Sequence, residues 1–105
     1  MELIIIKEVQ GETTILKLKG LLDISTQKII EPYIAEIESI KKLIFDFTEL
    51  DFIDSTGIGS IIDAIYVAQE KNFIIELTGV DEGIDDVFKT VGLYHILETI
   101  QEVGI

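Results

Sequence analysis

The order in which the hydrophobic residues change their periodicity is the strongest constraint on the fold of this chain. Short runs with the alternation typical of β-strands are separated by runs whose apolar residues recur three and four positions apart, as in amphipathic helices. The resulting order is β-β-α-β-α-β-α-α, and its β-α-β units join parallel neighbouring strands by right-handed crossovers. The sequence therefore predicts an α/β fold in which a mixed sheet of four to five strands is covered by about four helices.

The β-type runs place the strands. Residues 2–9 and 13–19 flank a polar turn and predict an N-terminal hairpin, with Gly20 expected to end the second strand. Residues 42–48 are apolar on both faces, so this strand should lie centrally in the sheet. Residues 73–78 form the last β-rich run.

Four helices are expected between and after these strands. The first should follow the capping residues 23–26 and bury the apolar positions Ile29, Tyr33, Ile37 and Ile40. Pro32 should either distort its first turn or mark its true beginning. The clearest helix carries apolar residues at Ile58, Ile61, Ile62, Ile65 and Ala68, and Asn72 suits its left-handed end. Two short helices, separated by Gly92, complete the chain.

Length and composition fit a single domain over residues 1–105. The chain is 48% apolar and 27% charged, which suffices for a packed core, and it shows no repeat or linker. It contains no cysteine, so disulfides, thiolate metal sites and cysteine nucleophiles are excluded.

The charge balance narrows the range of partners. Eight basic residues stand against 20 acidic ones, a net charge of −12, which would repel nucleic acid and anionic membranes. A basic protein surface is a better complement, although acidity also serves solubility. The apolar run from Leu3 to Ile6 is too short for a signal peptide or a membrane span, so we expect a cytoplasmic protein. The sequence leaves the oligomeric state open.

A polar-leaning connection, residues 49–54, leads from the central strand into the start of the clearest helix. Open α/β folds place their sites at this edge of the sheet. Ser55 or Thr56 should cap the helix. Gly57 and Gly59 each cost about 1 kcal/mol relative to alanine, so they indicate close approach by another backbone or a phosphate. The alternative is that residues 54–56 are only an N-cap cluster.

Catalysis and metal binding are not expected. A nucleophilic Ser55 would need an adjacent base, and the single histidine, His95, lies in the last predicted helix. The carboxylates of Asp46, Glu49, Asp51 and Asp54 lack the spacing of a calcium loop. We therefore expect no enzyme activity, no catalytic residue, no metal site and no cofactor.

Several segments together carry a family resemblance. They are Gly20-Leu21-Leu22-Asp23, Phe45-Asp46-Phe47-Thr48, Phe52-Ile53, Asp54-Ser55-Thr56-Gly57-Ile58-Gly59, Leu77-Thr78-Gly79 and Val91-Gly92-Leu93. In this order and spacing they resemble the STAS domain of bacterial anti-sigma-factor antagonists and sulfate-transporter tails. The likeness covers nearly the whole chain and implies a STAS-like fold.

The resemblance also implies a partner-switching cycle. Ser55 occupies the family's phosphorylated position, with Thr56 as a secondary acceptor. A kinase-type anti-sigma factor would bind the unmodified chain and phosphorylate it, and a PP2C-type phosphatase would reverse the modification. The implied partner-binding residues are Asp23, Asp54, Ser55, Thr56, Gly57, Ile58 and Gly59.

Two of these residues have structural alternatives, and the family has a second kind of member. Asp23 is expected near Ser55 at the same sheet edge, but it could equally cap the first helix. Asp54 could orient the loop or the incoming kinase, or only bind local amides. The alternative function is a non-switching STAS adaptor or a nucleotide-sensing subunit of a transport complex.

Overall fold

The predicted order of strands and helices is confirmed by the computed structural model, which describes residues 2–103. The elements are β1 (Leu3–Gln10), β2 (Thr13–Leu22), α1 (Gln27–Ala35), β3 (Lys42–Ile53), α2 (Ser55–Lys71), β4 (Ile74–Thr78), α3 (Glu82–Thr90) and α4 (Leu93–Val103). Within that range, no helix has the length and apolar character needed to cross a bilayer.

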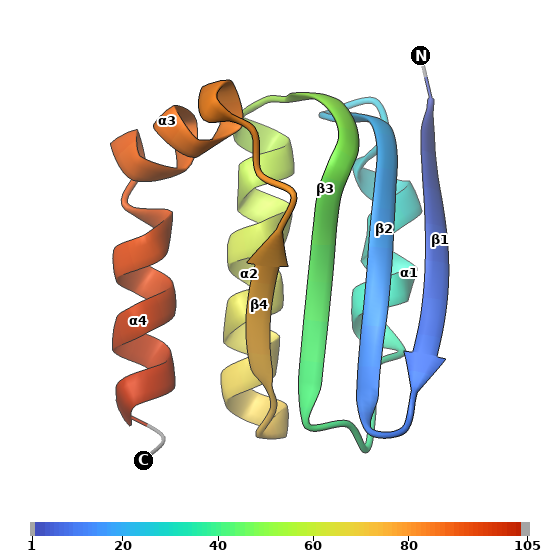
Figure 1. Ribbon diagram of the computed structural model, residues 1–105, viewed down its shortest axis with the longest axis vertical. Helices are drawn as coiled ribbons and strands as arrows, with labels where there is room; N and C mark the ends of the chain where they lie inside the picture. The colour runs from blue at the N-terminus through green and yellow to red at the C-terminus, as the bar shows by residue number, and fades with distance from the viewer. Residues whose placement is uncertain (1, 104–105) are drawn as a thin grey trace.

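The four strands form one mixed sheet in the order β1-β2-β3-β4 (Figure 1). β1 and β2 pair antiparallel around the turn at Gly11, as the hairpin prediction requires, and the other two pairings are parallel. β3 lies between β2 and β4, so the central placement expected for residues 42–48 is confirmed. All three parallel strands therefore end at the same edge of the sheet.

Among residues 2–103, the helices cover one face of the sheet and leave the other open. α1 and α2 lie behind the sheet in Figure 1, and α4 lies beside α2 past β4. Leu16, Leu18 and Phe45 point to this face and are buried, whereas their neighbours Lys17 and Asp46 on the other face stay partly exposed. The core therefore occupies a single layer between sheet and helices.

β3 is longer than expected, because it runs to Ile53 instead of ending at Thr48. Its register against β2 shifts twice, between Lys17 and Lys19 and between Gly20 and Leu21, and each shift places an extra residue in β3. Such bulges interrupt the two-residue alternation. Buried positions then fall three residues apart, at Leu50 and Ile53, so the prediction of a connection over residues 49–54 was wrong.

The expectation that Gly20 ends β2 was wrong. The strand continues to Leu22, and its register against β3 shifts directly after the glycine. Its φ of +103° is one that side chains disfavour, and a Cβ there would overlap the carbonyl oxygen of Glu2. Glycine is therefore needed at this position, where the backbone at the start of β1 lies close beside β2.

The buried positions in and after α1 agree only in part with those expected: Ile37, just past the helix, is buried, and Tyr33 and Ile40 pack partly buried against the core. Ile30 and Ile34 are buried, while Ile29 is 41% exposed. The helix begins at Gln27, well before Pro32, so the alternative of a start near the proline was wrong. Its first turn is tightened, because the Ile29 amide donates to the Thr26 carbonyl only three residues back, at 2.8 Å. The proline therefore sits inside a helix whose start is already irregular.

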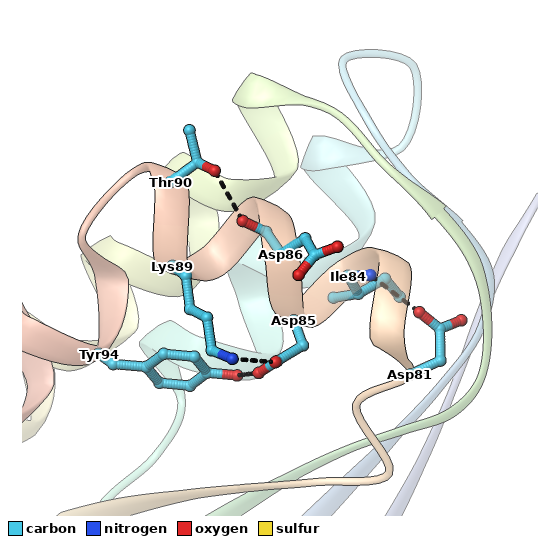
Figure 2. Close-up of polar contacts among 7 residues, drawn as sticks. All are labelled: Asp81, Ile84, Asp85, Asp86, Lys89, Thr90 and Tyr94. Carbon is cyan, nitrogen blue, oxygen red and sulfur yellow. Dashed lines mark hydrogen bonds and ion pairs between the residues drawn. The ribbon is translucent and has the colours of Figure 1, made fainter.

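The junction of α3 and α4 is held by edge-to-face aromatic contacts and by a polar cluster, and Figure 2 shows the polar cluster. Phe88 meets Phe47 and Tyr94 edge to face, with centroids 5.5 and 5.9 Å away. The Tyr94 hydroxyl donates to Asp85 at 2.6 Å, and Lys89 pairs with the same carboxylate at 2.9 Å. These donors lower the pKa of Asp85, while burial and the bond to Asp85 raise the pKa of Tyr94 to about 12.

Replacing Tyr94 by phenylalanine tests this junction. The raised pKa means that folding favours the neutral phenol, so its contribution is complete below the usual pKa of 10.0 and is lost as pH rises through about 12. We expect Tyr94→Phe to lower the free energy of unfolding by about 1 kcal/mol at neutral pH. It should also reduce the loss of stability over the alkaline range. Urea unfolding at a series of pH values measures both effects.

Tyr66→Phe is the matched control, because Tyr66 is 52% exposed on α2. It should leave both the neutral-pH stability and the alkaline loss unchanged. An alkaline loss that persists undiminished in Tyr94→Phe would contradict the assignment.

Candidate functional site

Two connections meet at the edge where β2 and β3 end, at the top of Figure 1. One is the β2–α1 turn, residues 23–26, and the other is the step from β3 into α2 at Asp54. The Asp54 amide donates to the Leu22 carbonyl at 3.3 Å and so joins the two connections directly. The site is built on this junction.

Asp54 is the N-cap of α2, which corrects the expectation that Ser55 or Thr56 would fill that position. One carboxylate oxygen accepts from the Gly57 amide at 2.9 Å, and the other accepts from the Ile24 amide at 3.1 Å. The extended backbone of Asp54 aims its side chain at both donors. A single carboxylate therefore satisfies the helix start and holds the neighbouring turn.

The β2–α1 turn is ordered from inside by Asp23 and Thr26. The Asp23 carboxylate accepts from the hydroxyl and the amide of Ser25, at 2.6 and 2.9 Å, and this pairing lowers the pKa of Asp23. Thr26 is only 2% exposed; its hydroxyl accepts from the Asp23 amide and donates to the Leu21 carbonyl. Thr26, not Asp23, is the N-cap of α1. Asp23 thus lies at the same edge as Ser55, as expected, in the turn that Asp54 holds.

Ser55 is the first residue of α2 and is exposed. Within residues 2–103 its hydroxyl makes no hydrogen bond, because Asp54 already does the capping. Thr56 and Gly59 are half-buried, whereas Gly57 and Ile58 are buried. Of the expected binding residues in α2, Ser55 offers the most accessible side chain, and Ile58 contributes to the core.

The two glycines differ in what surrounds them. A Cβ at Gly57 would overlap the Leu22 carbonyl oxygen, so here the close approach expected from the sequence is made by the chain's own backbone. A Cβ at Gly59 would meet nothing within 4 Å. The fold therefore explains Gly57 and leaves Gly59 available for an outside contact.

Two exposed apolar side chains flank the site and were not among the expected partner-binding residues. Ile24 is 75% exposed in the turn bound to Asp54, and Phe52 is 50% exposed on β3, opposite Leu21. Ile24 could have been noticed as an isoleucine inside a polar turn. Phe52 could not, because the bulges hide which face of β3 it occupies. Together they give the site an apolar margin suited to a protein partner.

Four surface hollows of about 140 to 400 Å³ are lined by residues other than Ser55 and Thr56. In the described part of the chain, no cluster of three or more acidic or histidine residues could hold a metal ion. His95 is exposed on α4, and no hydrogen bond between described residues joins it to Ser55.

Comparisons with known proteins agree with this arrangement. The STAS domain family model matches residues 5–104. A protein of Thermotoga maritima, described as a candidate anti-sigma factor antagonist, has a TM-score of 0.81 at 16% identity, covering 94% of this chain and 93% of its own.

Two further structures are similar. The Bacillus cell fate determinant SpoIIAA in its phosphorylated form has a TM-score of 0.72 at 24% identity, covering 95% of this chain and 99% of its own. A sulfate transporter family protein from Wolinella succinogenes has a TM-score of 0.76 at 20% identity, covering 87% and 75%. At these identities the likeness shows the fold.

The glycines give a paired prediction. Gly57→Ala should lower the free energy of unfolding by about 3 kcal/mol, because the methyl group overlaps the Leu22 carbonyl. Gly59→Ala should raise it by up to about 1 kcal/mol, because alanine favours the helix and the space is open. Urea denaturation of both variants measures the difference, and equal effects would contradict the contrast between the two positions.

Asp54 can be compared with the second aspartate N-cap. Asp81 caps α3 through the Ile84 amide at 2.8 Å, without a bond to another loop. Asp81→Ala should cost about 1 kcal/mol, whereas Asp54→Ala should cost about 1 kcal/mol more, because it also releases the Ile24 amide. Hydrogen exchange at Ile24 should quicken in Asp54→Ala only. Unchanged exchange there would show that Asp54 does not hold the turn.

Proposed function

This chain belongs to the STAS domain family, and from that premise we propose that it is an anti-sigma-factor antagonist switched by phosphorylation of Ser55. The observation that carries the proposal is the exposed Ser55 hydroxyl at the first position of α2, which is not used in capping. A kinase can reach such a group without unfolding the helix. Thr56, half-buried in the same turn, is the secondary acceptor.

The setting of Ser55 suits a modification that changes binding and not folding. A phosphate adds about −1.5 to −2 charges and three acceptor oxygens. The positive end of the helix dipole and the free amides of the first turn tolerate this charge. The nearby Asp54 carboxylate is itself negative, so it adds to the local negative charge, while its bonds to two amides keep the helix start in place. The fold should therefore persist while the surface becomes more negative.

The partner proposed here is a kinase-type anti-sigma factor, with a PP2C-type phosphatase reversing the modification. Such a partner would place a basic group near Asp23 and Asp54, which the net charge of −12 favours. Its apolar residues would cover Ile24 and Phe52. Gly59 would permit its backbone to approach, since nothing in this chain occupies that space.

A second candidate is a non-switching STAS adaptor or nucleotide-sensing subunit of a transport complex. The likeness to the sulfate transporter family protein of Wolinella succinogenes supports it. The accessible start of α2 could receive a phosphate group of a nucleotide. The two candidates differ in whether Ser55 is modified.

Incubation with ATP and a kinase-type anti-sigma factor, read by intact mass, tests the proposal. We expect one phosphoryl group on the wild type and on Thr56→Ala, a much slower modification of Ser55→Ala through Thr56, and none on the variant that carries both substitutions. Under conditions in which the partner does not phosphorylate the chain, Ser55→Asp should bind it at least about tenfold more weakly than the wild type does. Ser55→Ala should bind it constitutively. Calorimetric titration measures both affinities.

The folding of each variant is checked by urea denaturation, where Ser55→Asp should match the wild type within about 0.5 kcal/mol. Equal affinity of Ser55→Asp and Ser55→Ala would refute the switch. Saturable nucleotide binding by this chain alone, without modification of Ser55, would favour the adaptor instead.

A further inference from the structure

The two edges of the sheet are protected unequally. β4 has only five residues, and its Ile75 amide is bound by the side chain of Gln101 from α4 at 2.6 Å. β1 has eight residues, and within residues 2–103 no strand pairs with its outer side (Figure 1). Its amides and carbonyls on that side are therefore available to another strand.

β1 carries Lys7 and Glu8, but it lacks two other devices that keep an edge strand from pairing, a bulge and a proline. Its register with β2 runs without a bulge from Leu3 to Gln10, and it contains no proline. Ile4, Ile6 and Val9 are 47%, 45% and 62% exposed. An apolar, regular and open edge of this length favours an occupant.

We propose that the occupant is a second copy of this chain, whose β1 pairs antiparallel with β1 about a two-fold axis at Ile6. A two-fold axis perpendicular to the sheet leaves every side chain on the same face of the sheet. Because side chains alternate between the faces along a strand, residues that face each other must be an even number of positions apart. An axis at Ile6 places Ile6 opposite itself, Leu3 opposite Val9, Ile4 opposite Glu8 and Ile5 opposite Lys7. The proposal is independent of the function of Ser55.

Charge selects this register over its neighbours. Like charges that face each other destabilise a strand pair. An axis at Lys7 would place Lys7 opposite Lys7 of the other copy, and an axis at Ile5 would place Glu2 opposite Glu8. The axis at Ile6 opposes no like charges. It also covers the exposed Val9, and Glu8 keeps its ion pair with Lys17, at 2.7 Å.

The paired molecule would contain one continuous sheet of eight strands with all helices on the same face. The Ser55 edges of the two copies would point in opposite directions, because the strands of the pair are antiparallel. Each copy carries a net charge of −12, so association should strengthen as salt screens the repulsion. A contact made largely by one strand pair is small, so a dissociation constant of about 1 to 100 µM is expected.

Sedimentation equilibrium of the full chain, from about 1 µM to about 1 mM, tests the proposal. The wild type should show a monomer–dimer equilibrium. Ile6→Lys places two lysines opposite each other and should raise the dissociation constant at least about tenfold. Ile74→Lys is the matched control, since Ile74 is 48% exposed on the other edge strand, and it should dimerise like the wild type.

Single cysteines test the register, because the chain contains none of its own. Facing residues have Cα atoms about 4.5–5.5 Å apart, so Ile6→Cys should form a disulfide-linked dimer on mild oxidation. Val9→Cys should not, because the two copies of that position would lie about 20 Å apart.

Three outcomes would overturn the proposal. They are a monomer throughout the concentration range, a dimer that tolerates Ile6→Lys but not Ile74→Lys, and faster cross-linking at Val9→Cys than at Ile6→Cys. The first would leave the edge to a strand of another protein. None of them bears on whether Ser55 is phosphorylated.

Discussion

The fold and the candidate site share one group, the Leu22 carbonyl, which fixes where α2 begins. It accepts the Asp54 amide, and it occupies the space that a side chain on Gly57 would need. The Asp54 carboxylate then spans the same junction from Gly57 to Ile24. Because α2 begins against this carbonyl, the position of Ser55 follows from the end of β2 and not from its own contacts. The hydroxyl is left unused by the fold.

The fold could be predicted from periodicity wherever periodicity was regular. The hairpin, the central β3, the end of α2 at Asn72 with φ of +61° and the two last helices all follow local patterns. The failures occur where tertiary structure changes the pattern. Bulges in β3 convert alternation into three-residue spacing, and packing against α2 selects Ile30 and Ile34 over Ile29 as the buried face of α1. A single sequence does not reveal which of two apolar stripes meets the core.

The candidate site could be located but not assembled from the sequence. Glycines after a serine at the start of a helix, beyond a central strand, indicate Ser55 as the candidate, and its role stays a prediction. The sequence predicts Ser55 or Thr56 as the N-cap instead of Asp54, because aspartate and serine are both good N-caps and here occupy adjacent positions. The reasons for Gly57 and Gly59 proved different, and only coordinates could separate an internal carbonyl from open space. The experiments on Ser55 test whether a partner protein binds this surface.

The junction around Gly57 is made mostly of main-chain atoms, and this has an evolutionary consequence. The carbonyl of Leu22 could come from any residue type and the three amides of Ile24, Asp54 and Gly57 from any type except proline, so most side chains around them are free to diverge. Only the missing Cβ and one carboxylate constrain the sequence. The side chains around this junction can therefore change while the Ser55 hydroxyl keeps its place at the edge of the sheet.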